Sequence, residues 1–128
     1  MSRGGRYSFG KALRLRRRRE FLALQRSGAH RRSANMIVVA QKRTDLPPPS
    51  PTRLGIVASR KVGCAVARNR AKRLVREAFR QTRHELPGSL DVLVVTTRTA
   101  ATASLEAIRA ELASAVKVLG QRLAKGDG

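Results

Sequence analysis

The chain has 128 residues, and its 28 lysines and arginines against 8 aspartates and glutamates give a formal net charge of +20 at pH 7. This length suits one domain with one hydrophobic core, and so large a positive charge favours a polyanionic partner, of which nucleic acid is the obvious example. No stretch is apolar over the roughly 20 residues that a membrane span needs, and the N-terminus lacks the apolar segment of a signal peptide, so we expect a cytoplasmic protein.

The N-terminal part of the chain predicts a basic arm followed by a short helix. Residues 1–13 are rich in glycine and arginine, have little apolar periodicity and are expected to stay disordered until they meet nucleic acid. A helix is predicted over residues 14–26, with Gly28 as a stop signal. Phe21 on this helix is interpreted as a core residue, with projection into a groove where bases stack as the alternative.

The middle of the chain predicts strands separated by a loop. Residues 29–42 contain the apolar run 36–40, which is rich in β-branched side chains, and they are predicted to form one strand or two strands broken near residues 33–35. Four of the five prolines lie within residues 45–52, which predicts an exposed loop without regular structure. Residues 53–59 predict another strand, in which Leu54, Ile56 and Ala58 alternate with Gly55, Val57 and Ser59.

Residues 61–83 are best explained as one basic amphipathic helix, entered through a turn that contains glycine. Its apolar residues recur at helical spacing and form one stripe: Ala71, Leu74, Val75, Ala78 and Phe79. A second stripe is cationic and is flanked by Arg68 and Lys72: Asn69, Arg73, Arg76, Arg80 and Arg83. Glu77 is the only acid in this segment. Because ordinary solvated faces mix charges of both signs, a polyanionic partner explains this face better than solvation alone.

The C-terminal part predicts one more strand and one more helix. Residues 91–97 contain an apolar run typical of a strand that is covered on both faces. The order strand, helix, strand predicts a parallel pair joined by a crossover, and such crossovers are right-handed as a general rule. Thr102 or Ser104 is expected to cap the last helix, and Gly120 predicts its early end. Apolar residues at helical spacing predict that this helix packs on the core: Leu105, Ile108, Leu112, Val116, Leu119 and Leu123.

Groups that would catalyse a reaction are absent from the sequence pattern. The eight acids are scattered, and no two have a spacing that suggests a two-metal site. His30 and His84 have no partner at ligand spacing and are interpreted as surface or capping residues. Cys64, the single cysteine, is expected to pack as a small residue near the start of the basic helix. From its residues alone, the chain is interpreted as a binding protein with no catalytic residue, metal site or bound cofactor.

The segment SRKVGCAVARNRAKRLVREAFR, residues 59–80, closely resembles the signature of the bacterial ribonuclease P protein subunit. The hallmark of that family is an Arg-Asn-Arg helix, seen here as Arg68, Asn69 and Arg70. The likeness is specific because the lead-in before this triplet and the basic continuation after it occur together and in order. The order of elements over about residues 13–123 also fits the family.

The resemblance implies an α+β fold, a two-layer α/β sandwich with the order helix, three strands, basic helix, strand and C-terminal helix, and with a left-handed crossover. One RNA-binding domain is then expected over residues 14–123, between the arm 1–13 and a tail 124–128. The implied function is that of an accessory subunit of an endoribonuclease, whose RNA subunit removes the 5' leader of precursor tRNA by phosphodiester hydrolysis, with magnesium serving the RNA-catalysed reaction. The implied partners are ribonuclease P RNA and precursor tRNA, with one protein monomer for each RNA.

The family's binding residues can be carried over by position. Contacts with the catalytic RNA fall on Arg60, Lys61, Arg68, Asn69, Arg70, Lys72, Arg73, Arg76 and Arg80. The groove for the single-stranded leader is lined or bordered by Phe21, Ile37 and Val39. Members of the family usually have more than one aromatic residue in this groove, whereas this chain has Gln25 and Val39 where aromatics would be expected. Leader binding is therefore expected to depend on charge and on the ring of Phe21.

Three other functions are weighed against this one. Composition and charge equally allow a ribosomal-type structural RNA-binding protein, and the ordered spacing around Arg68, Asn69 and Arg70 is what separates the two. A helix-turn-helix DNA-binding regulator is disfavoured because strands flank the basic helix and no second helix lies three or four residues away. A stand-alone protein nuclease is least favoured because the acids are scattered.

Overall fold

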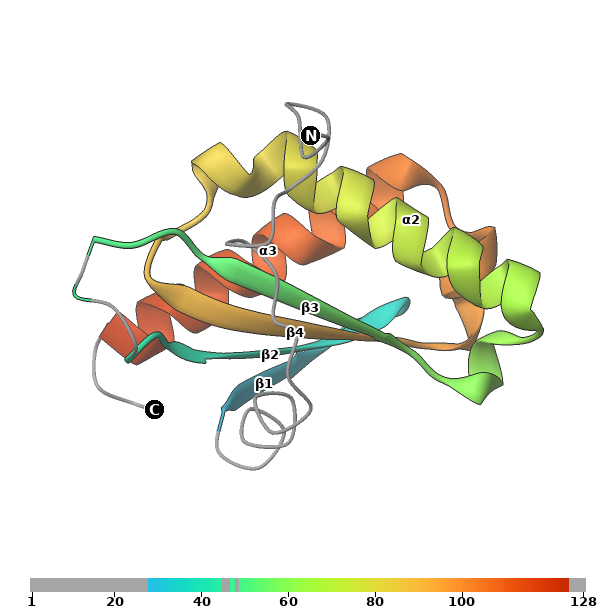
Figure 1. The fold of residues 1–128 in the computed structure, drawn as a ribbon, viewed down its shortest axis with the longest axis horizontal. Helices are drawn as coiled ribbons and strands as arrows, with labels where there is room; N and C mark the ends of the chain where they lie inside the picture. Colours follow the sequence, from blue (N-terminus) through green and yellow to red (C-terminus); the bar gives the residue numbers. More distant parts are fainter. Residues whose placement is uncertain (1–27, 45–46, 48, 125–128) are drawn as a thin grey trace, which may run out of the picture.

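The computed structural model describes residues 28–44, 47 and 49–124, which form a four-stranded sheet with two α-helices on one face (Figure 1). The predicted arm and first helix, with Phe21 and Gln25, lie outside the described residues. No helix of the described part is long and apolar enough to cross a membrane.

The strands are β1 (Ala29–Arg32), β2 (Met36–Lys42), β3 (Arg53–Ala58) and β4 (Leu90–Thr96), in the sheet order β1-β2-β4-β3. Residues 29–42 thus form two strands, which pair as an antiparallel hairpin. β4 lies in the middle of the sheet and pairs antiparallel with β2 and parallel with β3. Its near-complete burial agrees with the prediction of a strand that is covered on both faces.

The helical segments follow the predicted order. They are the 3-10 helix η2 (Arg60–Val62), the basic helix α2 (Ala65–Thr82), the 3-10 helices η3 (Arg83–Glu85) and η4 (Arg98–Thr102), and the C-terminal helix α3 (Leu105–Ala124). Ser104 caps α3, because its Oγ accepts a hydrogen bond from Ala107 N at 3.1 Å. This confirms one of the two caps that the sequence predicted.

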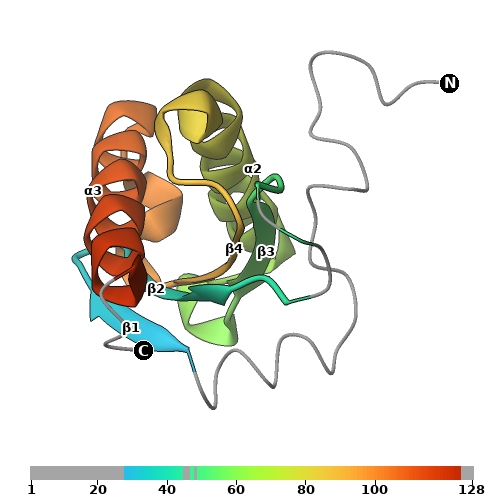
Figure 2. The ribbon, with the colours of Figure 1, turned by 90° about the vertical axis from the view of Figure 1, so that its left-hand side faces the viewer.

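The connection from β3 through α2 to β4 is a left-handed crossover. Figure 2 looks along these two parallel strands from the end where they begin, with β3 to the right of β4 and with α2 above the sheet. The chain therefore rises from β3, returns through α2 and steps leftward into β4. This is the handedness that the family resemblance implied, and it departs from the general right-handed rule.

The main core lies between the sheet and the two helices (Figure 2). The predicted apolar stripe of α2 faces it, with Val75, Ala78 and Phe79 almost fully buried and Leu74 half-buried. The sheet contributes alternate residues of its central strands: Met36, Val38, Ala40, Val92 and Val94. The helix α3 contributes its apolar residues at helical spacing: Ile108, Leu112, Val116 and Leu119.

Gly120 does not end α3, which continues to Ala124. The prediction of an early stop was wrong because Gly120 serves a packing role rather than a terminating one. A Cβ placed on Gly120 would lie 2.7 Å from Cγ of the Pro87 ring, in the segment that leads into β4. The absence of a side chain lets the backbone of α3 approach the Pro87 ring.

A carboxylate ties the hairpin turn to α3. Glu111 Oε1 accepts hydrogen bonds from Ser33 Oγ at 2.7 Å and from Asn35 N at 3.0 Å, and its Oε2 accepts a further bond from Asn35 Nδ2. Asn35 is 8% exposed, so Glu111 satisfies donors that water reaches poorly. Sequence periodicity could not reveal this tie, because Glu111 and Asn35 are 76 residues apart.

Replacing Gly120 by alanine tests the close approach to Pro87. Alanine has a higher helix propensity than glycine by about 1 kcal/mol. The clash should nevertheless lower the free energy of unfolding, by about 1–3 kcal/mol, as overpacking does. Urea denaturation would measure this, with Ser114→Ala at an exposed position of α3 as the control, expected to be neutral or slightly stabilising. A stabilised Gly120→Ala variant would contradict the proposed packing.

Replacing Glu111 by alanine tests the tie to the hairpin turn. We expect the free energy of unfolding to fall by about 1–3 kcal/mol, because Asn35 would lose acceptors for buried donors. Glu106→Ala is the matched control, because the side chain of Glu106 is 86% exposed and pairs only loosely with Arg109 at 3.8 Å. Equal losses in the two variants, measured by thermal or urea unfolding, would refute a specific role for Glu111.

Candidate nucleic-acid interface

A turn that requires glycine starts the basic helix. After η2 the chain passes through Gly63 at φ 134°, a conformation that favours glycine, and Gly63 N donates to Arg60 O at 3.1 Å. Cys64 follows as the N-cap of α2 and is exposed. The expectation that Cys64 packs as a small residue was therefore wrong, although its place at the helix start was right. The turn fixes the direction in which α2 leaves the sheet.

Small residues hold the first half of α2 against η4. Val62, Ala71, Ala100 and Ala101 form a buried cluster of their own. Alanine side chains let the two helical segments approach closely, and Arg70 Nε donates a hydrogen bond to Ala101 O at 2.7 Å across the contact. Arg70, the second arginine of the Arg-Asn-Arg triplet, is thus a positioning residue for this half of the helix as well as a cation on its surface.

The structure brings all nine predicted contact residues for the catalytic RNA onto η2 and α2. Six are exposed: Arg60, Lys61, Asn69, Arg70, Arg73 and Arg76. Three are half-buried: Arg68, Lys72 and Arg80. We call these nine residues the α2 face. They come from one short stretch of chain, so helix geometry alone is enough to gather them.

The cations of the α2 face differ in their availability. Arg80 is engaged with Glu77, since Arg80 Nε donates to Glu77 Oε1 at 3.0 Å and a second contact joins Nη2 to Oε2. Arg80, and after it Gln81, lower the pKa of the Glu77 carboxyl. Within the described part of the chain, no hydrogen bond or ion pair occupies the side chains of Arg60, Lys61, Arg68, Lys72 or Arg73. These five side chains provide the open positive field of the face.

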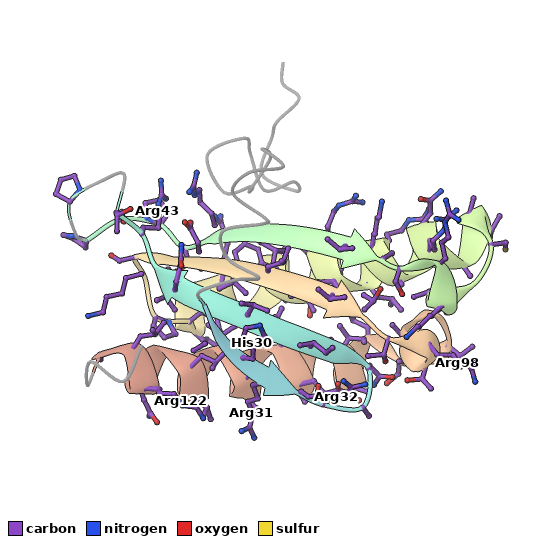
Figure 3. The ribbon with its side chains drawn as sticks, turned by 90° about the horizontal axis from the view of Figure 1, so that it is seen from below. His30, Arg31, Arg32, Arg43, Arg98 and Arg122 are labelled. Carbon is purple, nitrogen blue, oxygen red and sulfur yellow. The ribbon has the colours of Figure 1, made fainter. Side chains whose placement is uncertain are left out.

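Ile37 and Val39, two of the three predicted groove residues, lie on the outer face of the sheet, the face without α2 and α3. The third, Phe21, lies outside the described residues. Figure 3 views the molecule from the side of the outer face. A second apolar cluster there contains Val39 and Leu93, which are 1% and 0% exposed, together with half-buried neighbours. The half-buried members are Ile37, Val57 and Val95. The structure thus places Ile37 and Val39 on one face, and Ile37 is the more accessible of the two.

One end of this outer face is closed by an ion pair that the sequence analysis missed. Arg53 donates to Asp91 through Nε at 2.8 Å and Nη2 at 3.0 Å, and the two residues are directly opposite in the parallel register. Arg43 Nε lies 4.0 Å from the same carboxylate and its Nη1 donates to Pro51 O at 2.6 Å. The available signal was weak: an acid at the start of an apolar strand, whose main partner Arg53 is 38 residues away in the sequence.

The acids of the described part lie close to basic or polar groups. These neighbours are Arg80 for Glu77, His84 for Glu85, Arg53 for Asp91, Arg109 for Glu106 and Asn35 for Glu111. No three histidine, cysteine or acidic side chains come together among these residues as a metal site would require. The arrangement of cations described here can bind a polyanion.

Similarity to known proteins agrees with this site. The sequence model of the family Ribonuclease P matches residues 9–120. The chain belongs to this family. The ribonuclease P protein component of Desulforapulum autotrophicum is 36% identical over 125 residues, which cover 97% of this chain and 99% of the relative. That of Desulfovibrio desulfuricans is 38% identical over 120 residues, or 92% and 91% of the two chains.

Solved structures show the same fold. The ribonuclease P protein of Staphylococcus aureus superposes with a TM-score of 0.72 at 26% identity, covering 84% of this chain and 95% of that one. The protein from Thermotoga maritima gives a TM-score of 0.70 at 31% identity, covering 81% and 94%. The Ribonuclease P family, which the triplet Arg68, Asn69 and Arg70 first indicated, thus accounts for both sequence and fold.

Cys64 offers a chemical probe of the turn before α2. The backbone N–H groups of Ala67 and Val66, with Arg68 nearby, lower the pKa of the Cys64 thiol, which raises its thiolate fraction at neutral pH. We expect iodoacetamide to alkylate the folded protein faster than the urea-unfolded chain, as followed by mass spectrometry. A short cysteine peptide in each solvent corrects for reagent effects. Equal corrected rates would show that the helix start does not activate the thiol.

Proposed function

We propose that this chain is the protein subunit of a ribonuclease P, which assists an RNA subunit in removing the 5' leader from precursor tRNA. The observation that carries the proposal is the α2 face, where five cations without partners in the described part stand on a rigidly held helix in a chain of the Ribonuclease P family. Phosphodiester hydrolysis is assigned to the RNA subunit, with magnesium serving that reaction.

The proposed role is electrostatic and geometric. The catalytic RNA and precursor tRNA repel each other, and a protein with a formal charge of +20 lowers that repulsion where it contacts both. The α2 face would bind phosphates of the catalytic RNA, releasing counterions as it does so. The outer face of the sheet would hold the single-stranded leader, with Ile37 and Val39 as its apolar floor or border and Phe21 as the proposed aromatic contribution.

The assembly follows from the same proposal. One protein monomer pairs with one RNA, and the complex acts in the cytoplasm on precursor tRNA. The α2 face contributes at low magnesium above all, because bound metal ions and protein cations both reduce repulsion between the RNAs.

Leader removal at low magnesium tests the proposal. A bacterial ribonuclease P RNA alone, this protein alone and the two together would be compared on one precursor tRNA. We expect cleavage to require the RNA and to rise sharply with the protein. Cleavage by the protein alone would overturn the assignment of chemistry to RNA, and RNA binding without any change in cleavage would favour a structural RNA-binding protein instead.

The variant Arg68→Gln/Arg73→Gln tests whether the α2 face carries this effect. We expect most of the stimulation to disappear and the slope of log affinity against log salt to become shallower by about 0.7–0.9 for each phosphate that is no longer neutralised. The control Lys117→Gln/Arg122→Gln removes the same charge from exposed positions of α3 and should retain the stimulation. An equal reduction in both variants would show that net charge alone, and not the α2 face, is responsible.

A further inference from the structure

A cavity lies at the C-terminal end of α2, which is the yellow end of this helix in Figure 1. We call it the α2-end cavity. Its volume is about 420 Å³, which falls in the range of roughly 300–1,000 Å³ that is typical of pockets for small ligands. It is lined by the end of α2 with η3, by the segment that leads into β3 and by the segment that leads into β4. The α2 face reaches this cavity at Arg80 but does not otherwise include it.

Hydrogen bonds fix two walls of the α2-end cavity to each other. Thr52 Oγ1 donates to Pro87 O at 2.6 Å and accepts from Leu90 N at 3.3 Å. Beside this contact, Ser89 N donates to Ser50 O at 2.7 Å, and Ser50 N donates to Ser89 Oγ at 3.0 Å. These bonds join the segment before β3 to the segment before β4. The cavity is therefore preorganised, and little conformational entropy would be lost when a ligand binds.

One part of the lining is apolar and supported from the protein side. It consists of Pro51, Leu86 and Pro87. The Pro87 ring packs on α3 at Gly120, the carbonyl of Pro51 accepts a hydrogen bond from Arg43 Nη1 at 2.6 Å, and Leu86 is 8% exposed. Apolar walls with a few charged or polar groups among them are typical of pockets that bind small organic molecules.

The other part of the lining is cationic. Arg83 is exposed, and its side chain forms no hydrogen bond or ion pair within the described residues. Arg80 is held by Glu77 at 3.0 Å, and a guanidinium fixed in one plane can stack on a base. His84 adds an exposed imidazole, and its neighbour Glu85 lines a separate cavity between α2 and α3. Because no described residue that lines the α2-end cavity is acidic, the cavity favours an anionic ligand.

The two parts of the lining together suit a nucleotide. A bare phosphate would contact the cations and leave the apolar wall unused, whereas an uncharged ring would leave the cations unused. A nucleotide carries both a phosphate and a ring. In RNA, a nucleotide that is unpaired and unstacked can place its base in a protein pocket, whereas the bases of a duplex are stacked inside it.

We propose that the α2-end cavity binds one unpaired nucleotide of the catalytic RNA, with Arg83 on its phosphate and with Leu86 and Pro87 against its base. The inference rests on the proposed function and adds a pocket to the α2 face. The catalytic RNA is preferred to precursor tRNA as the occupant for two reasons. Arg80 belongs both to the α2 face and to the cavity, and Pro87 packs on α3, on the helix side of the molecule.

The variant Arg83→Gln tests the phosphate contact through the affinity of the protein for the catalytic RNA over a range of salt. We expect this affinity to fall several-fold and the slope of log affinity against log salt to become shallower by about 0.7. The control Arg122→Gln removes the same charge from an exposed position in the last turn of α3 and should bind like the unmutated protein. The affinity of the assembled complexes for precursor tRNA should be unchanged in both variants.

Three results would overturn this inference while leaving the proposed function intact. They are an unchanged affinity of Arg83→Gln for the catalytic RNA, an equal loss in Arg122→Gln, and a loss that is confined to precursor tRNA, which would make the substrate the occupant. In contrast, failure of the unmutated protein to bind the catalytic RNA at all would overturn the proposed function.

A titration without RNA tests whether the base enters the cavity. The isotope-labelled protein would be titrated with adenosine monophosphate and, at equal ionic strength, with inorganic phosphate, and the amide signals of Leu86 and Gly88 would be followed by NMR. We expect larger shifts with the nucleotide than with phosphate, and loss of these shifts in Arg83→Gln. Equal shifts with the two ligands, or none with the nucleotide, would overturn the nucleotide site.

Discussion

Burial of one apolar stripe holds the charged helix α2 in place. Val75 and Phe79 are fully buried, and a side chain of this kind contributes about 1.5–3 kcal/mol when it leaves water. Like charges one helical turn apart, such as Arg68 and Lys72, oppose the helix by only tenths of a kcal/mol for each pair. The free energy gained by burying the apolar stripe therefore exceeds the repulsion between the cations. The helix can display a strongly cationic face without any partner bound.

The distribution of charge follows from the same balance. Three acidic side chains in the described part connect neighbouring elements or side chains. Glu111 bonds the hairpin turn to α3, Asp91 bonds Arg53 at one end of the outer face, and Glu77 bonds Arg80. Most of the remaining cations point outward. The 8 acids offset only 8 of the 28 basic charges, and the excess of positive charge that remains is expressed as an external field.

Much of the fold could be predicted because it depends on local pattern. Helical spacing located α2 and α3, and a run of β-branched residues located β2, since these patterns reflect which side chains face a core. The position of Gly120 in α3 could not be interpreted, because its reason is contact with Pro87, which is distant in the sequence. The tie between Glu111 and Asn35 was invisible for the same reason.

In the candidate site, too, the features that depend on local sequence could be predicted and those that depend on distant contacts could not. The α2 face could be predicted because its residues lie in one short stretch of chain, η2 and α2. Their availability, in contrast, depends on partners such as Ala101 O for Arg70 and Glu77 for Arg80. The position of Ile37 beside Val95 and Val57 required the strand register, which a single sequence does not specify. The exposed position of Cys64 depends on how the turn at Gly63 is oriented. The local sequence pattern does not specify that orientation.

The left-handed crossover determines which side of the sheet remains open. With β3 at the edge, β4 beside it and both running the same way, the hand of the connection decides on which face α2 must lie. A right-handed connection between the same two strands would carry α2 to the outer face and cover Ile37, Val57 and Val95. The uncommon hand instead puts α2 and α3 on one side, where they pack against each other, and leaves Ile37, Val57 and Val95 on the other side, clear of both helices. Chirality of a single connection thus separates the side of the molecule that makes the core from the side that is free to meet a nucleic-acid strand.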